Sequence, residues 1–156
     1  MIQLRRMTQT EYEAYYQNAV QNLANEMAKA NRIAPEETLC AAKKWFEMLL
    51  PKNDLNVPDQ YLCNIFADGQ KIGFLWFAVR RDRIGAAEVF VWEISIEPSS
   101  RKKGYGRQAM LALEDEARAL GISRISLNVF AHNASARKLY DNLGYDAISS
   151  CMLKCL

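Results

Sequence analysis

The residues best suited to chemistry lie in one short segment rich in glycine and in cations. Arg101–Arg107 holds four basic residues among its seven, and Gly104 and Gly106 let a ligand approach the backbone closely. The segment leads into an amphipathic stretch typical of a helix, whose first N–H groups are free and whose dipole is positive at that end. Amides and cations gathered in this way predict a site for an anion such as a diphosphate.

The same segment also fits a degenerate dinucleotide-binding pattern. Gly104–Ala109 reads Gly-x-Gly-x-x-Ala, but such a domain needs an acidic residue about 20 positions further on, at the end of the next strand. The next expected strand ends in Leu127-Asn128-Val129-Phe130, which holds no acid. Only Met110–Leu156 follow the motif, too few residues for the rest of a dinucleotide domain. The sequence therefore argues against that fold.

The elements that must position this loop alternate between strand and helix patterns. Runs of branched and aromatic residues predict strands, and apolar steps of three and four predict helices. We expect strands at Ile2–Met7, Tyr61–Ala67, Lys71–Arg80, Glu88–Ile96 and Ile125–Val129, with one or two closing strands in Tyr145–Leu156. We expect helices after a Thr10-x-x-Glu13 capping box, after Pro35, from about Gly104 to Leu120, and over Ala134–Leu143. This order predicts an α/β protein with a mixed sheet.

The composition is that of a soluble globular domain and excludes several other classes. The 156 residues are 50% hydrophobic and 24% charged, which is too apolar for a disordered chain. Lys and Arg total 20 against 18 Asp and Glu, and a net charge of +2 does not suggest a general nucleic-acid binder. No apolar run approaches the ~20 residues that span a bilayer, and no signal-peptide pattern begins the chain, so we expect a cytoplasmic protein. Four cysteines without a Cys-x-x-Cys motif and a single histidine argue against a metal site.

Two motifs together resemble the GNAT superfamily of acetyltransferases. The loop Arg101-Lys102-Lys103-Gly104-Tyr105-Gly106 matches the family's acetyl-CoA pattern, (Arg/Gln)-x-x-Gly-x-(Gly/Ala). The strand Trp92–Pro98 and the later segment Asn133–Tyr145 are also similar to the family, so the resemblance covers most of the chain. It implies the GNAT fold: a central, mixed and mostly antiparallel twisted sheet flanked by about four helices, with splayed strands at the cofactor site. It also implies a single GNAT domain over residues 1–156.

The resemblance implies transfer of an acetyl group from acetyl-CoA to a primary amine, of a small molecule or a protein, by direct attack in a ternary complex. The pyrophosphate is then expected on the amides of Arg101, Lys102, Lys103, Gly104, Tyr105, Gly106 and Arg107. The pantetheine arm is expected to pair with backbone groups of Ile94, Ser95 and Ile96, one of whose N–H groups would polarise the thioester carbonyl. Asn133 is the expected side-chain contact to the cofactor.

Two residues are candidates for proton transfer. Tyr140 stands where the family has a general acid, and a phenol with a pKa near ~10 is a plausible donor to a CoA thiolate, whose thiol has a pKa near ~8.5. It also lies on the apolar face of its helix, so a core tyrosine is the alternative. Glu93 is the candidate general base for an alkylammonium with a pKa near ~10.4. The sequence leaves open which face of the sheet Glu93 occupies, and a paired or edge carboxylate is its alternative.

Other interpretations of the same features stay open. A non-catalytic acyl-CoA-binding sensor would keep the loop without turnover, whereas the near-neutral charge disfavours a nucleic-acid patch at Arg101–Lys103. We expect His132 to be exposed or capping rather than catalytic. The aromatic residues of the first helix are expected mostly in the core, with one or two left to line a substrate pocket: Tyr12, Tyr15 and Tyr16. The acceptor is not indicated, and a homodimer stays open because dimers are common in the family.

Overall fold

The computed structural model describes the whole chain, Met1–Leu156, as a sheet with helices on both faces. Five strands lie in the order β1 (Ile2–Arg6), β2 (Gln60–Ala67), β3 (Gln70–Arg81), β4 (Ala87–Ile96) and β5 (Ile125–Leu127). All neighbours are antiparallel except β4 and β5, which are parallel. The helices are α1 (Gln9–Asn31), α2 (Pro35–Leu49), α3 (Tyr105–Ala119) and α4 (Ala134–Asn142), with 3-10 turns at Pro51–Asn53 and Pro98–Ser100. The predicted mixed, mostly antiparallel sheet with four helices is confirmed.

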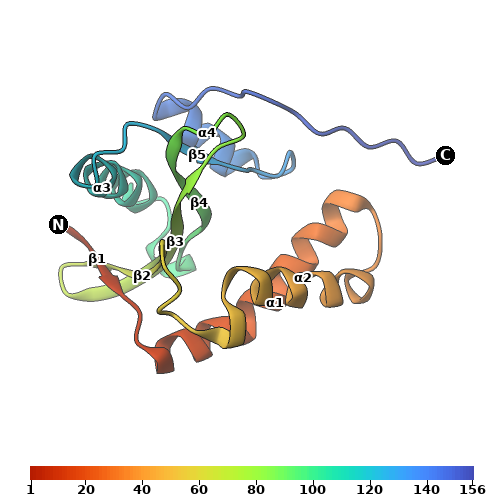
Figure 1. Ribbon diagram of the computed structural model, residues 1–156, viewed down its shortest axis with the longest axis horizontal. Helices are drawn as coiled ribbons and strands as arrows, with labels where there is room; N and C mark the ends of the chain where they lie inside the picture. The colour runs from red at the N-terminus through yellow and green to blue at the C-terminus, as the bar shows by residue number, and fades with distance from the viewer.

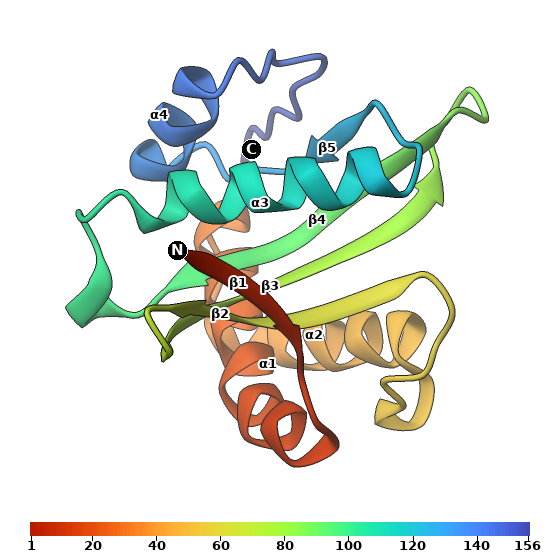
Figure 2. The same cartoon turned by 90° about the vertical axis from the view of Figure 1, so that its left-hand side faces the viewer.

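The helices form two layers, one on each face of the sheet. Figure 1 and Figure 2 show α3 and α4 on one face and α1 and α2 on the other. Successive strand residues point to opposite faces, so a strand covered on both sides is apolar at successive positions. Leu75 and Phe77 pack with α3, whereas Trp76 between them packs with α1 and α2. None of the helices has the length and apolar character needed to cross a membrane.

Turn and capping residues fix where the elements begin. Asp68 and Gly69 both adopt positive φ, 50° and 82°, and join β2 to β3 as the expected hairpin turn. The expected capping box at Thr10 is wrong by two residues, because the cap is Thr8. The Thr8 hydroxyl accepts from the Glu11 amide at 3.3 Å, and the Glu11 carboxylate accepts from the Thr8 amide at 2.8 Å. Thr8 with Glu11 and Thr10 with Glu13 both have the Thr-x-x-Glu spacing of a capping box. Only Glu11 also receives a hydrogen bond from the buried Asn64 of β2, at 2.8 Å, and this contact favours the cap at Thr8.

The C-terminal segment differs from the expectation. Tyr145–Leu156 contains no strand, and from Asp146 onward its residues are exposed and run away from the body of the molecule (Figure 1). Two features account for this. β5 has only three residues, so it offers a short edge for pairing. The adjacent polar pair Ser149-Ser150 and the apolar run Cys151–Leu153 also break the alternation that would give a strand one apolar face.

Candidate functional site

The second half of β4 leaves the regular pairing of the sheet. β5 pairs with β4 only at Val89–Val91, so the edge of β4 that faces β5 has no partner over Trp92–Ile96. The opposite edge stays paired with β3 as far as Ile96. Unpaired N–H and C=O groups along an edge can accept an extended ligand as an added strand. The structure therefore brings the predicted residues Ile94, Ser95 and Ile96 to an open edge.

A β-bulge at Trp92 decides which way the residues of β4 point. Val91 and Glu93 lie opposite consecutive residues of β3, so Trp92 between them has no opposite residue. Trp92 packs with α1 and α2, and Glu93 also faces this layer because Tyr15 of α1 is hydrogen-bonded to it. Ile94, next along the strand, packs toward α3. The sequence left open which face of the sheet Glu93 occupies. In the structure its side chain lies on the face that α1 and α2 cover.

The N-terminus of α3 offers free amides. Gly104 is the N-cap with φ +78°, no side chain caps the helix, and its first turn holds no acidic residue. The first helical hydrogen bond runs from the Gln108 amide to the Gly104 carbonyl at 3.1 Å, and no backbone hydrogen bond is donated by Tyr105, Gly106 or Arg107. Three free amides and the positive end of a helix dipole are what a phosphate needs.

The cations of the loop remain without acidic partners. Arg101 donates from Nε to the Ile96 carbonyl at 2.8 Å, and Lys103 donates from Nζ to the Ser99 carbonyl at 3.0 Å. These bonds tie the loop to the end of β4 and to the preceding 3-10 turn. Neither these two nor the other two cations of the loop form an ion pair. Its positive charge is therefore not neutralised within the chain, which favours an anionic ligand.

Glu93 has one hydrogen-bond partner and no cation. The Tyr15 hydroxyl donates to Glu93 Oε2 at 2.6 Å, and no other hydrogen bond or ion pair reaches this carboxylate. Burial raises the pKa of Glu93, and the hydrogen bond from Tyr15 acts in the opposite direction. A carboxyl group with a raised pKa is a stronger base, and a largely buried carboxylate without a cation is incomplete until a positive group joins it.

Tyr140, a residue of α4, lies on the opposite face of the sheet in the same hydrophobic cluster as the inner residues of α3. The residue is 8% exposed, and its ring centroid is 5.7 Å from that of Tyr145. Burial raises the pKa of Tyr140, so its phenol is protonated at neutral pH. A tyrosine that serves only the core usually finds a partner for its hydroxyl, whereas the hydroxyl of Tyr140 has no hydrogen-bond partner in the protein and is not sealed from solvent.

The loop between β5 and α4 carries Asn133 and His132. Asn133 is the N-cap of α4, where its Oδ1 accepts from the Ala136 amide at 3.2 Å, and its Nδ2 stays free to donate to a ligand. His132 is exposed, as expected, but it also pairs through Nε2 with Glu26 Oε2 of α1. This pair links the layer that holds α1 to the loop that holds Asn133, a contact that the sequence did not indicate.

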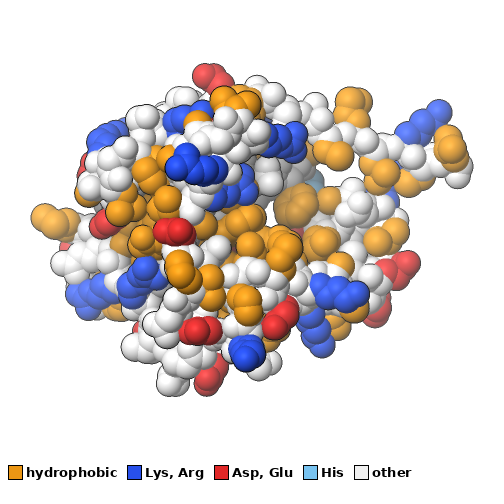
Figure 3. Space-filling view, viewed as in Figure 1, with side chains coloured by type: hydrophobic (Ala, Val, Ile, Leu, Met, Phe, Trp, Pro, Cys, Tyr) orange, Lys and Arg blue, Asp and Glu red, His pale blue; other side chains and the backbone are white.

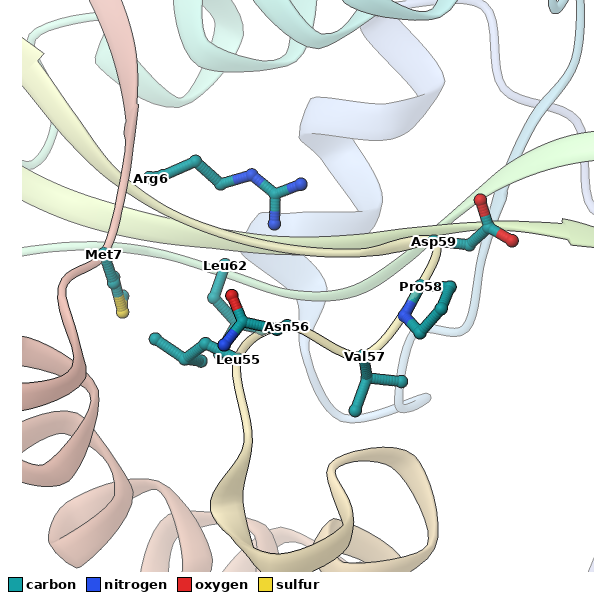
Figure 4. A pocket seen from close by; sticks show the side chains of 8 residues that line it. All are labelled: Arg6, Met7, Leu55, Asn56, Val57, Pro58, Asp59 and Leu62. Carbon is teal, nitrogen blue, oxygen red and sulfur yellow. The ribbon is translucent and has the colours of Figure 1, made fainter.

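A pocket of about 380 Å³ lies away from these residues (Figure 4). It is lined by Arg6, Met7, Leu55, Asn56, Val57, Pro58, Asp59 and Leu62. None of the expected cofactor or catalytic residues lines it, and β3 separates β2 from β4. On the face seen in Figure 3, the surface is instead recessed between the part that holds β5 and α4 and the part that holds α1 and α2, with hydrophobic side chains beside the recess.

Known proteins share the fold and the family motifs of this chain. The model of the acetyltransferase (GNAT) family matches residues 12–145. YycN of Bacillus subtilis strain 168, an uncharacterized N-acetyltransferase, is 34% identical over 154 residues, 98% of this chain and 97% of its own. The crystal structure of YycN has a TM-score of 0.92 at 33% identity and covers 100% of this chain and 99% of its own. The chain belongs to the acetyltransferase (GNAT) family.

Two other proteins extend the comparison. YdgE, also an uncharacterized N-acetyltransferase of Bacillus subtilis strain 168, is 32% identical over 144 residues, 91% of this chain and 90% of its own. A Clostridium acetobutylicum protein, solved with acetyl-CoA and described as an acetyltransferase, has a TM-score of 0.61 at 16% identity and covers 99% of this chain and 96% of its own. At 16% identity, the likeness to the Clostridium acetobutylicum protein concerns the fold alone. The resemblance read from the sequence motifs is thus confirmed at the level of the family.

Besides the pair of His132 and Glu26, three further features of the site were missed from the sequence. At Gly73 of β3, an added Cβ would lie 2.1 Å from the carbonyl oxygen of Ser95, so the two strands approach closely beside the open edge. A glycine inside a strand is a signal of such an approach and could have been used. The bulge at Trp92 and the hydrogen bond between Tyr15 and Glu93 have no comparable signal, because both depend on the register of β4 against its neighbours.

Proposed function

We propose that the protein transfers an acetyl group from acetyl-CoA to a primary amine, of a small molecule or a protein, by direct attack within a ternary complex. Residues 1–156 act as one acetyltransferase domain in this proposal. The four cysteines are free thiols, which supports a reduced, cytoplasmic setting.

The loop and the edge of β4 fit the acetyl donor. The free amides at the start of α3, the left-handed conformation of Gly104 and the unpaired cations of Arg101–Arg107 suit a diphosphate. The open edge at Ile94–Ile96 suits a pantetheine arm, and Asn133 Nδ2 suits a polar group of the same molecule. Acetyl-CoA supplies the thioester when it is bound. These groups then hold and orient the donor and expose one N–H of β4 to the thioester carbonyl.

Glu93 and Tyr140 handle the protons of the reaction. Glu93 accepts a proton from the substrate ammonium, which frees the amine lone pair that forms the new C–N bond. As the C–S bond breaks, the Tyr140 hydroxyl donates its proton to the leaving sulfur. The nitrogen loses its second proton to solvent as the amide forms, and solvent returns a proton to Tyr140. The raised pKa of each group suits its role, since Glu93 becomes a stronger base and Tyr140 stays protonated at neutral pH.

One observation carries the proposal: a single stretch of β4 combines an unpaired edge with a largely buried carboxylate that has no cation. The edge spans Trp92–Ile96, and Glu93 lies within it, turned toward α1. An acyl-CoA-binding sensor needs the edge and the loop, but it has no need of an uncompensated carboxylate beside them. That carboxylate favours an enzyme whose second substrate is cationic.

The experiment is a measurement of CoA release with acetyl-CoA and a panel of amines. The panel contains polyamines, amino sugars, lysine-containing peptides and peptides with free N-termini. We expect turnover with at least one of these classes and its loss in Glu93→Gln at lower pH, where the amine is charged. Acetyl-CoA binding by calorimetry without turnover on any amine would contradict the proposal and indicate the sensor.

A further inference from the structure

We propose that Tyr15 of α1 is a positioning residue for acetyl transfer, because its hydroxyl holds Oε2 of Glu93 and leaves Oε1 for the substrate ammonium. The inference rests on the proposed function and assigns a role to a residue outside the motifs of the loop. The hydrogen bond between Tyr15 and Glu93 is 2.6 Å long and joins α1 to the bulged part of β4. Oε1 has no hydrogen-bond partner in the protein and is not sealed from solvent.

Packing fixes the ring of Tyr15, so its hydroxyl cannot swing freely. Phe74 of β3 meets the ring edge-on at a centroid distance of 4.7 Å. Tyr12, three residues earlier in α1, lies at 6.1 Å, and Phe46 of α2 at 6.4 Å. A ring held from the sheet and from both helices presents its hydroxyl in one place, which is what a positioning residue requires.

Few charged or titratable groups face Glu93, so this hydrogen bond dominates its polar surroundings. From α1 these groups are Tyr15 and, behind it, Tyr12 and Tyr16, whereas α2 contributes only apolar and aromatic side chains to the same cluster. From β3, Arg80 lies over the ring of Trp92 at 5.4 Å, but its Nε is bound to Glu88 at 2.9 Å. Tyr15 is therefore the single group that donates to Glu93.

The direction of the effect follows from which form of Glu93 the hydrogen bond favours. A donor to a carboxylate stabilises the charged form and lowers its pKa, against the burial that raises it. Burial and the charge of Glu93 raise the pKa of Tyr15 well above its usual value, so Tyr15 stays protonated and keeps donating. Loss of the hydroxyl would raise the pKa of Glu93 further and free the carboxylate to rotate.

The test compares Tyr15→Phe with Tyr16→Phe. Tyr16 is the next residue of α1 and packs edge-on against Phe46 at 5.4 Å, but it makes no hydrogen bond to Glu93. Carboxyl-carbon NMR follows the titration of Glu93, whose signal is assigned by its loss in Glu93→Gln. This readout needs no acceptor. In parallel, kcat/KM is measured against pH with the amine that the panel identifies as best.

We expect Tyr15→Phe to move the titration of Glu93 to higher pH by about one to two pH units, the size of a hydrogen bond to a charged group. The acid limb of kcat/KM should move with it, and rates above that limb should also stay below wild type, because the carboxylate is then free to rotate. Tyr16→Phe should overlay the wild type in both measurements. In a Glu93→Gln background, Tyr15→Phe should cause no further change. Thermal melting checks that each variant folds.

Each contrary outcome has a distinct meaning. An unmoved Glu93 titration in Tyr15→Phe overturns the inference, whatever the rates show. A moved titration with an unmoved acid limb also overturns it, because the hydrogen bond is then only structural. If no amine is acetylated by the wild type, the proposed function fails and the catalytic role of Tyr15 fails with it, while the NMR result still reports whether Tyr15 holds the carboxylate charged.

Discussion

Replacement of Tyr140 by phenylalanine separates the catalytic from the structural role of this residue. The hydroxyl has no hydrogen-bond partner in the protein, so its removal breaks no internal bond, and the buried ring stays in place. We therefore expect the free energy of unfolding to change by less than ~1 kcal/mol. Turnover should fall by roughly 100- to 10,000-fold, the range for loss of a general acid, or about 3–5 kcal/mol in the barrier.

The assay is the initial rate of thiol release from acetyl-CoA at a saturating amine concentration, with the affinity for acetyl-CoA measured by calorimetry. The affinity should stay near the wild-type value, because the hydroxyl acts on the leaving sulfur during the reaction. Burial raises the pKa of Tyr140 above its ordinary value of about 10. A general acid must be protonated to act, so its deprotonation should not limit turnover between pH 7 and roughly pH 9.

Tyr145→Phe is the matched control. Tyr145 is a neighbouring tyrosine whose hydroxyl is buried without a partner, and burial is the main cause that raises its pKa to about 12. Its removal takes away an unsatisfied buried group, so we expect unchanged turnover and a stability equal to wild type or higher by ~1 kcal/mol. Turnover of Tyr140→Phe within two- to threefold of wild type would refute the general-acid role and indicate that Tyr140 serves only as a core residue.

Three further substitutions test the elements that hold the site. Gly104→Val puts a branched side chain at φ +78°, a backbone conformation that such residues disfavour. We expect the affinity for acetyl-CoA, measured by calorimetry, to fall about tenfold. An unchanged affinity would refute the assignment of this loop to the diphosphate of acetyl-CoA. Gly73→Ala puts a Cβ 2.1 Å from the Ser95 carbonyl oxygen, so β3 and β4 must separate. We expect the free energy of unfolding, measured with denaturant, to fall by ~1–3 kcal/mol. Wild-type stability would contradict the close approach of the two strands. Thr8→Ala removes the side-chain half of the capping box of α1, the hydrogen bond from the Glu11 amide to the Thr8 hydroxyl, and should cost ~1 kcal/mol. The hydrogen bond from the Thr8 amide, the main cause that lowers the pKa of Glu11, stays in the variant, whereas the Thr8 hydroxyl, which donates to Glu11 Oε2 at 3.0 Å and also lowers that pKa, is lost. The part of the difference that comes from this hydroxyl should be full above the unfolded pKa of Glu11 and shrink as the pH falls through the folded pKa, and wild-type stability at neutral pH would argue against the capping role.

The sequence was most informative where local patterns and tertiary structure agree. The start of α3 was predicted at about Gly104, and that glycine is the N-cap with a left-handed backbone. The α4 segment was predicted within one residue, because Asn133 and the apolar face ending at Leu143 are both local signals. The cap at Thr8 was missed because the neighbouring spacing fits the same rule, and a contact from β2 decides between them.

The C-terminus was missed for a different reason. A run of apolar residues after Tyr145 resembles a strand, but a strand also needs a neighbour with a long enough edge. β5 was expected to reach Val129 and ends at Leu127, and the segment beyond Tyr145 stays exposed. Periodicity within a segment gives no information about the length of the strand beside it, whereas the broken alternation at Ser149–Leu153 was a local signal against a strand.

The bulge at Trp92 links these local patterns to the proposed chemistry. Without it, strict alternation from Val91, which packs toward α3, would turn Glu93 toward α3 as well. The extra residue turns Glu93 toward Tyr15 and the α1–α2 layer, while Ile94 resumes the packing toward α3. The open edge and the carboxylate therefore belong to one strand, with the carboxylate directed to the side where α1 and α2 can shape an acceptor site.

The charges beside this strand explain why a net charge of +2 says so little about the site. The loop Arg101–Arg107 holds cations with no acidic partner, and Glu93 is an acid with no cationic partner. The two sets do not neutralise each other, since the cations lie at the start of α3 and Glu93 faces α1. In the proposed function, each would be completed by a ligand of opposite charge: the loop by an anionic acetyl donor, and Glu93 by a cationic amine. Such an arrangement favours simultaneous binding of both substrates, because neither has to displace an internal ion pair before it binds.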